Sequence, residues 1–159
     1  MTHEGENPAA TARSRLPLRA EHLIPHRLPT RLVDTLLSRD GESGVTESRI
    51  PTDAVVADDD GRLDETAVVE LIAQSYAAVR GHLDLSTGTP PTTGFLVGIR
   101  DFAITGSAYA GDHLLTSVRT VASHEGFAVV DGTVTRGGET LAVCTVTLWI
   151  AEPVVPRQP

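Results

Sequence analysis

The segment over residues 63–83, LDETAVVELIAQSYAAVRGHL, limits the possible folds more than any other part of the chain. Its pattern predicts one helix with apolar side chains in nearly every direction, whereas a surface helix carries an apolar stripe on one side only. The apolar run is interrupted only by Glu70, Gln74 and Ser75. In water such a helix must be surrounded by other elements, so we predict that the rest of the chain curls around it.

Glu70 is the residue of this helix that most needs an explanation. Glu70 and Gln74 are four residues apart, so their side chains stack on the same helix face. An ionised carboxylate without a partner is costly to bury, so Glu70 should be paired, protonated or used in chemistry. The structural alternative is a buried carboxylate paired with an arginine or with helix-end donors. We expect Gln74 to hydrogen-bond to Glu70 or to a strand backbone.

Both ends of the helix carry recognisable signals. Asp64 is a plausible N-cap, and Glu65 adds favourable charge to the first turn. Arg80 and Gly81 are typical of a C-terminal end, although the helical pattern can continue for one further turn.

The composition excludes several kinds of partner. The 159 residues fit one domain, which we place at residues 19–152 between flexible tails at 1–18 and 153–159. The net charge of −8 argues against nucleic acid and against an anionic membrane surface. A single cysteine, Cys144, excludes an internal disulfide, and the histidines give only a weak metal signal, so we predict no metal site. Without an 18-residue apolar run or a signal-peptide core, we expect a cytoplasmic protein.

Alternation of apolar and polar residues predicts strands on both sides of the helix. It is clearest near the end of the chain, where every second residue from Ala142 to Ile150 is apolar, as in a half-buried antiparallel strand. Residues 20–26 are expected to form a short helical turn or coil, and the acidic loop over residues 57–61 is expected to be solvated. The predicted strands cover residues 30–38, 44–50, 94–103, 112–123, 127–135 and 139–150.

The predicted order is two strands, a long buried helix and four strands. An antiparallel sheet with one apolar face can cover an all-apolar helix by curling, with the helix on its concave side. This α+β arrangement is called the hotdog fold. Such a sheet keeps exposed edges and an open side, so we expect it to pair with a second copy or with a related chain.

Four segments carry a resemblance to a known family. Residues 23–34, LIPHRLPTRLVD, resemble the "LPHR-P-LLVDRV" opening of hotdog 3-hydroxyacyl-acyl-carrier-protein dehydratases. Residues 69–78, VELIAQSYAA, are similar to their central-helix "VEALAQAGG", with the Glu and the Gln in register. Residues 110–114, AGDHL, resemble "PGDxL", and Asp131-Gly132 resembles a late "DG". The resemblance extends over residues 22–150 and is nearest to the dehydratase-like proteins of aryl-polyene and related polyketide pathways.

The resemblance implies a lyase that removes water from a 3-hydroxyacyl thioester in fatty-acid or polyketide biosynthesis. The acyl group would be carried on the phosphopantetheine of an acyl carrier protein or on CoA, with no further cofactor. In the family, a Glu on the central helix acts with a His of the facing subunit, and the Glu corresponds to Glu70. The His has no counterpart, because the family's "GHFPG" is replaced by VADDDG over residues 56–61. We therefore expect a homodimer or a heterodimer with a second hotdog protein, and we favour the heterodimer because its second chain can supply the missing His. His26 is the resident candidate for this base.

The start of the helix also departs from the family pattern. Where the family has "PG", whose glycine amide polarises the thioester carbonyl, this chain has Asp64 and Glu65. Together with Thr66 and Gln74 these residues are the predicted substrate-binding positions. The negative charge of Glu65 has the wrong sign beside a developing enolate.

Several alternatives remain open at this point. His26 can be a structural or interface residue, and Cys144 is expected to fill the core. Asp58, Asp59 and Asp60 are expected to be solvated, although one of them could replace the family His as a weaker base. On the same scaffold the chain could be an acyl-thioesterase or isomerase, or a non-catalytic partner that binds an acyl chain.

Overall fold

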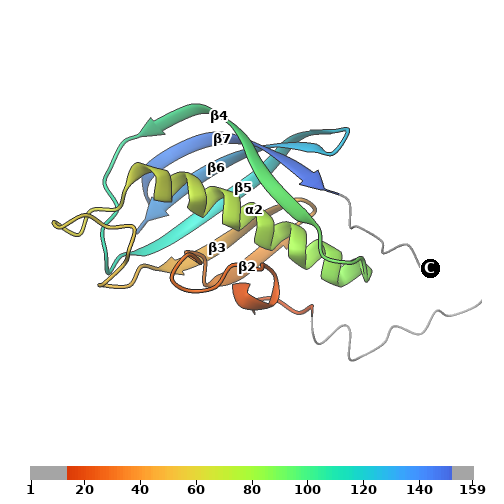
Figure 1. Cartoon of the computed structure of the whole chain (residues 1–159), viewed down its shortest axis with the longest axis horizontal. Coiled ribbons are helices and arrows are strands. Elements are labelled where there is room, and N and C mark those ends of the chain that lie inside the picture. The colour runs from red at the N-terminus through yellow and green to blue at the C-terminus, as the bar shows by residue number, and fades with distance from the viewer. Residues whose placement is uncertain (1–13, 152–159) are drawn as a thin grey trace, which may run out of the picture.

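The computed structural model describes residues 14–151 and contains an antiparallel sheet of seven strands with one long helix on its concave side (Figure 1). The strand order in the sheet is β1-β2-β3-β5-β6-β7-β4. This is the predicted hotdog fold. In chain order the elements are β1 (Leu18–Arg19), the 3-10 helix η1 (Ala20–His22), β2 (Thr35–Asp40), β3 (Ser43–Arg49), α2 (Glu65–Thr87), β4 (Thr93–Ile104), β5 (His113–His124), β6 (Phe127–Arg136) and β7 (Glu139–Ala151).

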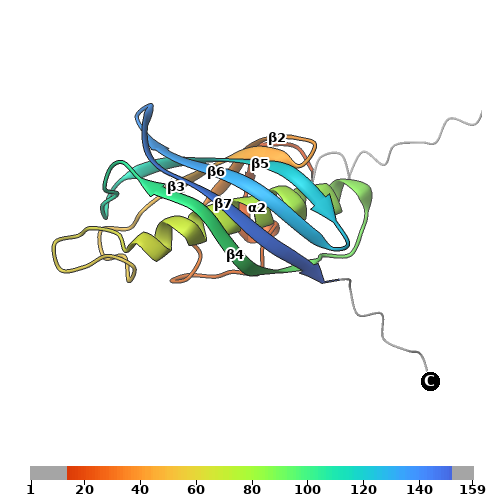
Figure 2. The ribbon, with the colours of Figure 1, turned by 90° about the horizontal axis from the view of Figure 1, so that it is seen from above.

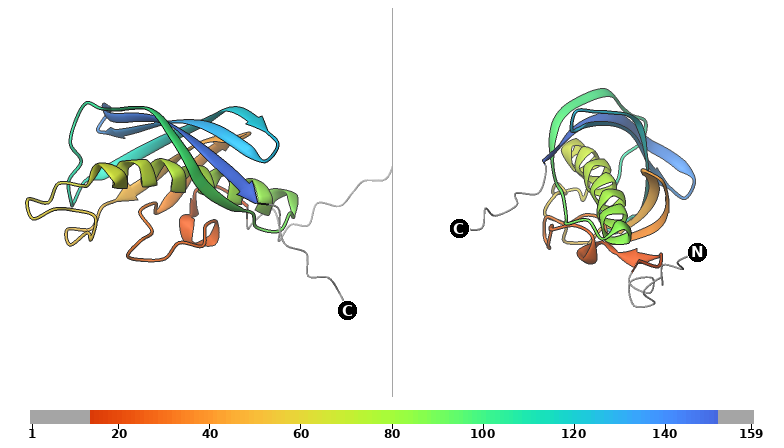
Figure 3. Two further views of the ribbon diagram at one scale, coloured as in Figure 1. Left: turned by 45° about the horizontal axis from the view of Figure 1, so that its top comes forward. Right: turned by 90° about the vertical axis from the view of Figure 1, so that its right-hand side faces the viewer.

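The sheet arches over α2, as the end-on view shows (Figure 3). The helix packs mainly against β2, β3, β5, β6 and β7. Leu71, Ile72 and Val79 are completely covered by this contact. The approach is so close at Gly132 of β6 that a Cβ there would collide with the Ile72 side chain, and a Cβ at Gly44 would lie 2.6 Å from Val79 Cγ2. The prediction of a helix sheathed by strands is confirmed.

The start of α2 agrees with the sequence prediction, whereas its end lies beyond the predicted end signals. Asp64 is the N-cap as predicted, and its Oδ1 accepts a hydrogen bond of 2.8 Å from the Thr66 backbone N–H. The helix does not end at Gly81 but continues to Thr87, where Gly88 adopts the left-handed conformation that closes a helix. Position 81 requires a glycine for a different reason, because a Cβ there would collide with the backbone carbonyl of Leu23.

Two strand predictions need correction. The strand predicted over residues 30–38 corresponds to β2, which begins at Thr35 because the backbone N–H of Leu32 donates to the Gln74 side chain of α2 and not to a neighbouring strand. In β5, Leu114 and Val118 face the core as predicted, but Ala122 is exposed because the pairing with β6 shifts register just before it.

The domain boundaries also differ from the prediction at one end. Leu16 packs against the core and Leu18 begins β1, so the domain starts before residue 19. The remainder of the predicted tails, residues 1–13 and 152–159, lies outside the described residues. Among residues 14–151, no helix combines the length and the apolarity needed to cross a membrane.

β4 forms one edge of the sheet and pairs only with β7 (Figures 1 and 2). Although it is an edge strand, it carries large apolar side chains that are substantially exposed, with half of the Phe95 surface open to solvent. The others on this strand are Leu96, Val97, Ile99 and Phe102. An unpaired apolar edge of this length is a surface that another strand would cover.

Hydroxyl groups lie in the core between α2, β3 and β5. Thr46 Oγ1 hydrogen-bonds to Ser75 Oγ at 2.6 Å, and Ser75 donates to the Leu71 carbonyl. Ser48 and Thr116 are equally buried, but their hydroxyls have no hydrogen-bond partner among the described residues. A buried polar group without a partner costs free energy.

This contrast predicts opposite effects for two similar substitutions. Thr116→Val should raise the free energy of unfolding by up to about 1 kcal/mol, because it removes a hydroxyl that forms no bond. Thr46→Val should lower it by about 1 kcal/mol, because it breaks the bond to Ser75. Urea denaturation of both variants measures the difference, and an equal loss in the two would show that Thr116 has a partner such as a buried water.

Candidate functional site

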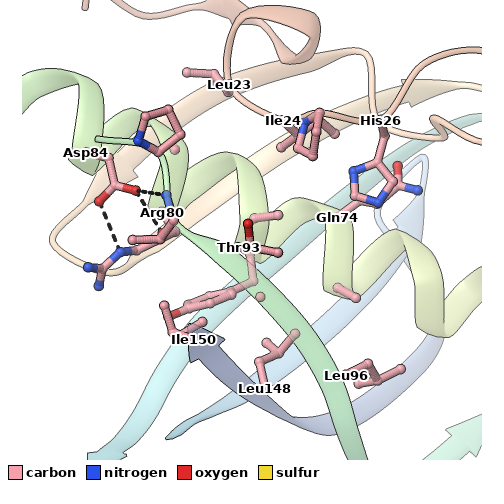
Figure 4. Close-up of a pocket in the computed structure, with 18 of the residues that line it drawn as sticks. Leu23, Ile24, His26, Gln74, Arg80, Asp84, Thr93, Leu96, Leu148 and Ile150 are labelled. Carbon is pink, nitrogen blue, oxygen red and sulfur yellow. Dashed lines mark hydrogen bonds and ion pairs between the residues drawn. The ribbon is translucent and has the colours of Figure 1, made fainter. Parts of the chain in front are cut away.

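A cavity of about 450 Å³ lies along the face of α2 that the sheet leaves open (Figure 4). The small side chains of Ala73 and Ala77 and the backbone of Gly81 form its floor. One wall comes from the segment over residues 21–27, which runs beside the helix, and the other from β4 and β7. The labelled apolar wall residues are Leu23, Ile24, Leu96, Leu148 and Ile150.

At one end of the cavity the structure brings together Glu70, Gln74 and His26, of which Figure 4 labels Gln74 and His26. Gln74 Nε2 donates a hydrogen bond of 2.8 Å to Glu70 Oε1. His26 Nε2 lies 3.7 Å from the same oxygen. These are the two predicted catalytic residues and one of the predicted substrate-binding residues. The three side chains lie together because the loop after β1 and η1 brings His26 to the face of α2 that carries Glu70 and Gln74.

Gln74 has no hydrogen-bonding capacity left for a substrate. In addition to Glu70, its Nε2 donates to the Thr30 carbonyl at 2.9 Å. Its Oε1 accepts from the Leu32 backbone N–H at 2.8 Å and from Val33 N–H at 3.4 Å. The side chain is almost fully buried. Gln74 thus holds Glu70 directly and fixes the loop that follows His26.

The His26 ring is oriented with one nitrogen towards Glu70 and the other into the protein. Nδ1 is buried and has no hydrogen-bond partner among residues 14–151. A neutral ring with its proton on Nε2 places that N–H towards the Glu70 carboxylate and leaves Nδ1 as a lone pair. A histidine that acts as a general base is usually oriented by a hydrogen bond at its second ring nitrogen. The described residues provide no such bond at Nδ1 of His26.

Glu70 is less buried than the sequence indicated. In the described part of the chain, about 43% of its side-chain surface is exposed, although Glu70 also lines the cavity. The carboxylate is held in place, but it still faces solvent on one side.

The other predicted substrate-binding residues lie outside the cavity. Asp64, Glu65 and Thr66 form the exposed first turn of α2 and do not line the cavity. Hydrogen bonds from the Thr66 side chain and backbone hold the pKa of the Asp64 carboxyl below its ordinary value of 3.8. Glu65 lies 3.9 Å from the Arg62 guanidinium. The cap thus occupies the Thr66 N–H, one of the donors at this helix end.

Sequence reasoning missed the polar groups at the far end of the cavity (Figure 4). Arg80 Nε lies 3.2 Å from Asp84 Oδ1, and Arg80 NH1 lies 3.2 Å from Glu42 Oε1. Asp84 Oδ2 also accepts from the hydroxyl and backbone N–H of Thr92. Burial, followed by the nearby Glu42 carboxylate, raises the pKa of the Tyr76 phenol in this cluster. The missed signal is the spacing of Glu70, Gln74, Arg80 and Asp84, which step along one helix face by multiples of three or four.

The remaining titratable residues do not form a second site. His22 and His26 have a four-residue spacing found in some metal sites, yet within residues 14–151 the acidic side chain that His22 approaches is Glu21, at 4.0 Å. The described part of the chain contains no group of three histidine, cysteine, aspartate or glutamate side chains that could hold a metal ion. Asp58, Asp59 and Asp60 are exposed, and Cys144 is buried.

A comparison with protein families gives a match over residues 18–155 to the family described as ApeP-like, ApeP dehydratase. This span includes β1 to β7 and all of the cavity. The chain belongs to the ApeP-like dehydratase family. No curated protein matches it.

Several solved structures share the fold of this ApeP-like chain. The dehydratase heterocomplex ApeI:P from Xenorhabdus doucetiae aligns with a TM-score of 0.79 at 17% identity, covering 85% of this chain and 92% of the other. A Streptococcus mutans UA159 protein bound to acetyl CoA aligns with a TM-score of 0.62 at 21% identity, covering 82% and 96%. A hypothetical thioesterase with coenzyme A from Streptococcus pneumoniae TIGR4 aligns with a TM-score of 0.58 at 14% identity, covering 73% and 84%.

Gln74 provides a test of how the site is held together. Gln74→Met keeps the length of the side chain but leaves the Leu32 N–H and the Thr30 carbonyl without partners, so it should lower the free energy of unfolding by about 2–3 kcal/mol. Gln74→Glu keeps the acceptor for Leu32 but places a second carboxylate beside Glu70. It should cost less at pH 4 than at pH 8, because protonation removes the repulsion. Chemical denaturation at both pH values measures the two effects, and a pH-independent cost for Gln74→Glu would contradict this geometry.

Proposed function

We propose that this chain dehydrates 3-hydroxyacyl thioesters carried on phosphopantetheine, together with a second hotdog chain that supplies the catalytic base. The observation that carries the proposal is the carboxyl group of Glu70, which Gln74 holds at the lining of an apolar cavity and which keeps about 43% of its side-chain surface exposed. An apolar cavity with one fixed carboxyl group fits an acyl chain whose reacting carbons lie beside that group.

The reaction requires two proton transfers, and a different group carries out each of them. Protonated Glu70 gives its proton to the 3-hydroxyl group, which leaves as water when the C3–O bond breaks. A base removes the proton from C2, and the electron pair of that C–H bond forms the C2–C3 double bond. His26, with its Nε2–H directed at Glu70, would hold the carboxyl group in position, and Gln74 would keep its orientation.

The described residues offer no well-prepared base opposite Glu70. Nδ1 of His26 has no hydrogen-bond partner among the described residues that would orient the ring as a base, and the aspartates of the 57–61 loop do not line the cavity. The likeness to the ApeI:P heterocomplex supports a pairing with a second hotdog chain. We infer that a histidine of that partner approaches the substrate from the side on which Glu70 is exposed.

The exposed edge of β4 is the surface that we assign to this partner. Leu96, which lines the cavity, and Ile99 on the same strand are both exposed. A strand of a second hotdog chain paired with β4 would cover these side chains and complete the backbone hydrogen bonds of the edge. It would also cover the side of Glu70 that is exposed in the single chain.

The carrier and the pathway are further parts of the proposal. The neighbours that contain CoA or acetyl CoA support a thioester on a phosphopantetheine arm, which CoA and acyl carrier proteins share. The family match supports a place in polyketide or polyene biosynthesis, and our proposal places this reaction in the cytoplasm. In this setting the product of the reaction is a 2-enoyl thioester.

Three observations favour other functions. The 3.7 Å approach of His26 to Glu70 favours a version in which His26 is the base and the chain acts without a different partner. The structural neighbours named as thioesterases favour a Glu70 that activates water. A capped helix start that does not line the cavity favours a non-catalytic subunit that only holds the acyl chain.

Dehydration assays of the chain alone and in complex with a second hotdog chain encoded beside it test the proposal. The isolated chain should be inactive on a carrier-bound 3-hydroxyacyl substrate, and the complex should form the 2-enoyl product. Glu70→Gln should lower kcat of the complex by about 10²-fold or more, because the acid is lost. His26→Gln should lower it less, and Glu139→Gln, a remote exposed carboxylate, serves as the matched control.

Each alternative has its own result in the same assays. Dehydration by the isolated chain would reject the need for a different partner. Release of free thiol from acyl-CoA would identify a thioesterase. Full activity of the complex with Glu70→Gln would remove the catalytic role of this residue and leave a structural subunit.

A further inference from the structure

A second cavity, of about 560 Å³, lies behind the polar end of the first one. It is bordered by the loop after α2, by the turn between β5 and β6, and by the end of β7, and it is more open to solvent than the first cavity. Most of its lining is apolar, including Pro90, Phe127, Ala128 and Ala151, with Thr89 and Ser123 at its sides.

The two cavities meet at a shared wall. Tyr76, Arg80, Thr92 and Ile150 line both of them. Tyr76 is almost fully buried, whereas Arg80 keeps about 30% of its side-chain surface exposed. A chain that follows the floor of the first cavity away from Glu70 therefore reaches Tyr76 and Arg80, and then the second cavity.

The charges at this wall indicate which end of a substrate reaches it. Arg80 is flanked by the carboxylates of Glu42 and Asp84, so the three groups together carry a negative charge. A phosphate group would be repelled there, which excludes the phosphate end of a phosphopantetheine arm. An uncharged acyl chain meets no such penalty.

We propose that the second cavity binds the distal end of a long acyl chain, and that Tyr76 and Arg80 decide which chains pass into it. This inference rests on the proposed function for the position of the thioester beside Glu70. Ten residues of helix separate Glu70 from Arg80, a distance of about 15 Å along the axis. Chains too short to span this distance stay in the first cavity, and longer chains gain apolar burial in the second.

Filling the second cavity tests the proposal. The probes are saturated acyl-pantetheine amides of increasing chain length, which bind without reacting, titrated calorimetrically into the complex of full-length chains. For the unmodified protein, affinity should rise again once the chain passes Arg80. Ser123→Trp and Thr89→Trp, which fill the cavity from two sides, should each lower the ratio of long-chain to short-chain affinity by about tenfold or more.

Ser117→Trp is the matched control, because Ser117 is exposed on β5 but lines neither cavity. It should leave the ratio unchanged. An unchanged ratio in both cavity variants, or an equal loss at every chain length, would overturn the proposal. If the complex binds long chains more tightly but has no dehydratase activity, the acyl-chain subsite is supported and the proposed reaction is rejected. If the complex dehydrates its substrate but binding does not depend on chain length, the reaction is supported and the subsite is rejected.

Discussion

The structure depends on the burial of one helix that is apolar on most of its surface. The sheet covers α2 with β2, β3, β5, β6 and β7, and glycines at positions 44 and 132 allow the close contact. Complete coverage would leave no room for a ligand. Since β4 is not among the main contacts of the helix, one face of α2 borders a cavity and not the core. The same element thus forms the hydrophobic centre of the domain and the floor of its binding site.

A buried amide connects this packing with the proposed chemistry. Gln74 occupies a position where most residues of α2 are apolar, and its polar atoms are bonded to Glu70 and to the backbone over residues 30–33. Loss of any of these bonds would leave a buried polar group unpaired, so the amide has essentially one orientation. The position of the carboxyl group is therefore set by the stability of the fold. His26 adds a further constraint from the loop that Gln74 fixes.

The order of elements could be predicted from the sequence because it depends on local periodicity, and α2 and the last four strands were predicted within a few residues. Errors occurred where a distant contact replaces a local rule. Gly81 resembles a helix end, but it is small because Leu23 packs against it. Residues 30–34 resemble a strand, but the backbone N–H groups of Leu32 and Val33 donate to the Gln74 side chain of α2. The exposure of Glu70 and the cluster of Arg80 with Asp84 depend on which helix face the sheet leaves uncovered, and composition does not indicate that face.

The open face beside Glu70 and the apolar edge of β4 are parts of the same surface, and in our account one partner completes both. The most direct test is an experimental structure of this chain bound to its hotdog partner with an unreactive 3-hydroxyacyl analogue. We expect a partner strand along β4, and a partner histidine within hydrogen-bond distance of C2 of the analogue, opposite Glu70. A complex in which β4 remains uncovered, with no partner side chain near the analogue, would contradict the shared active site.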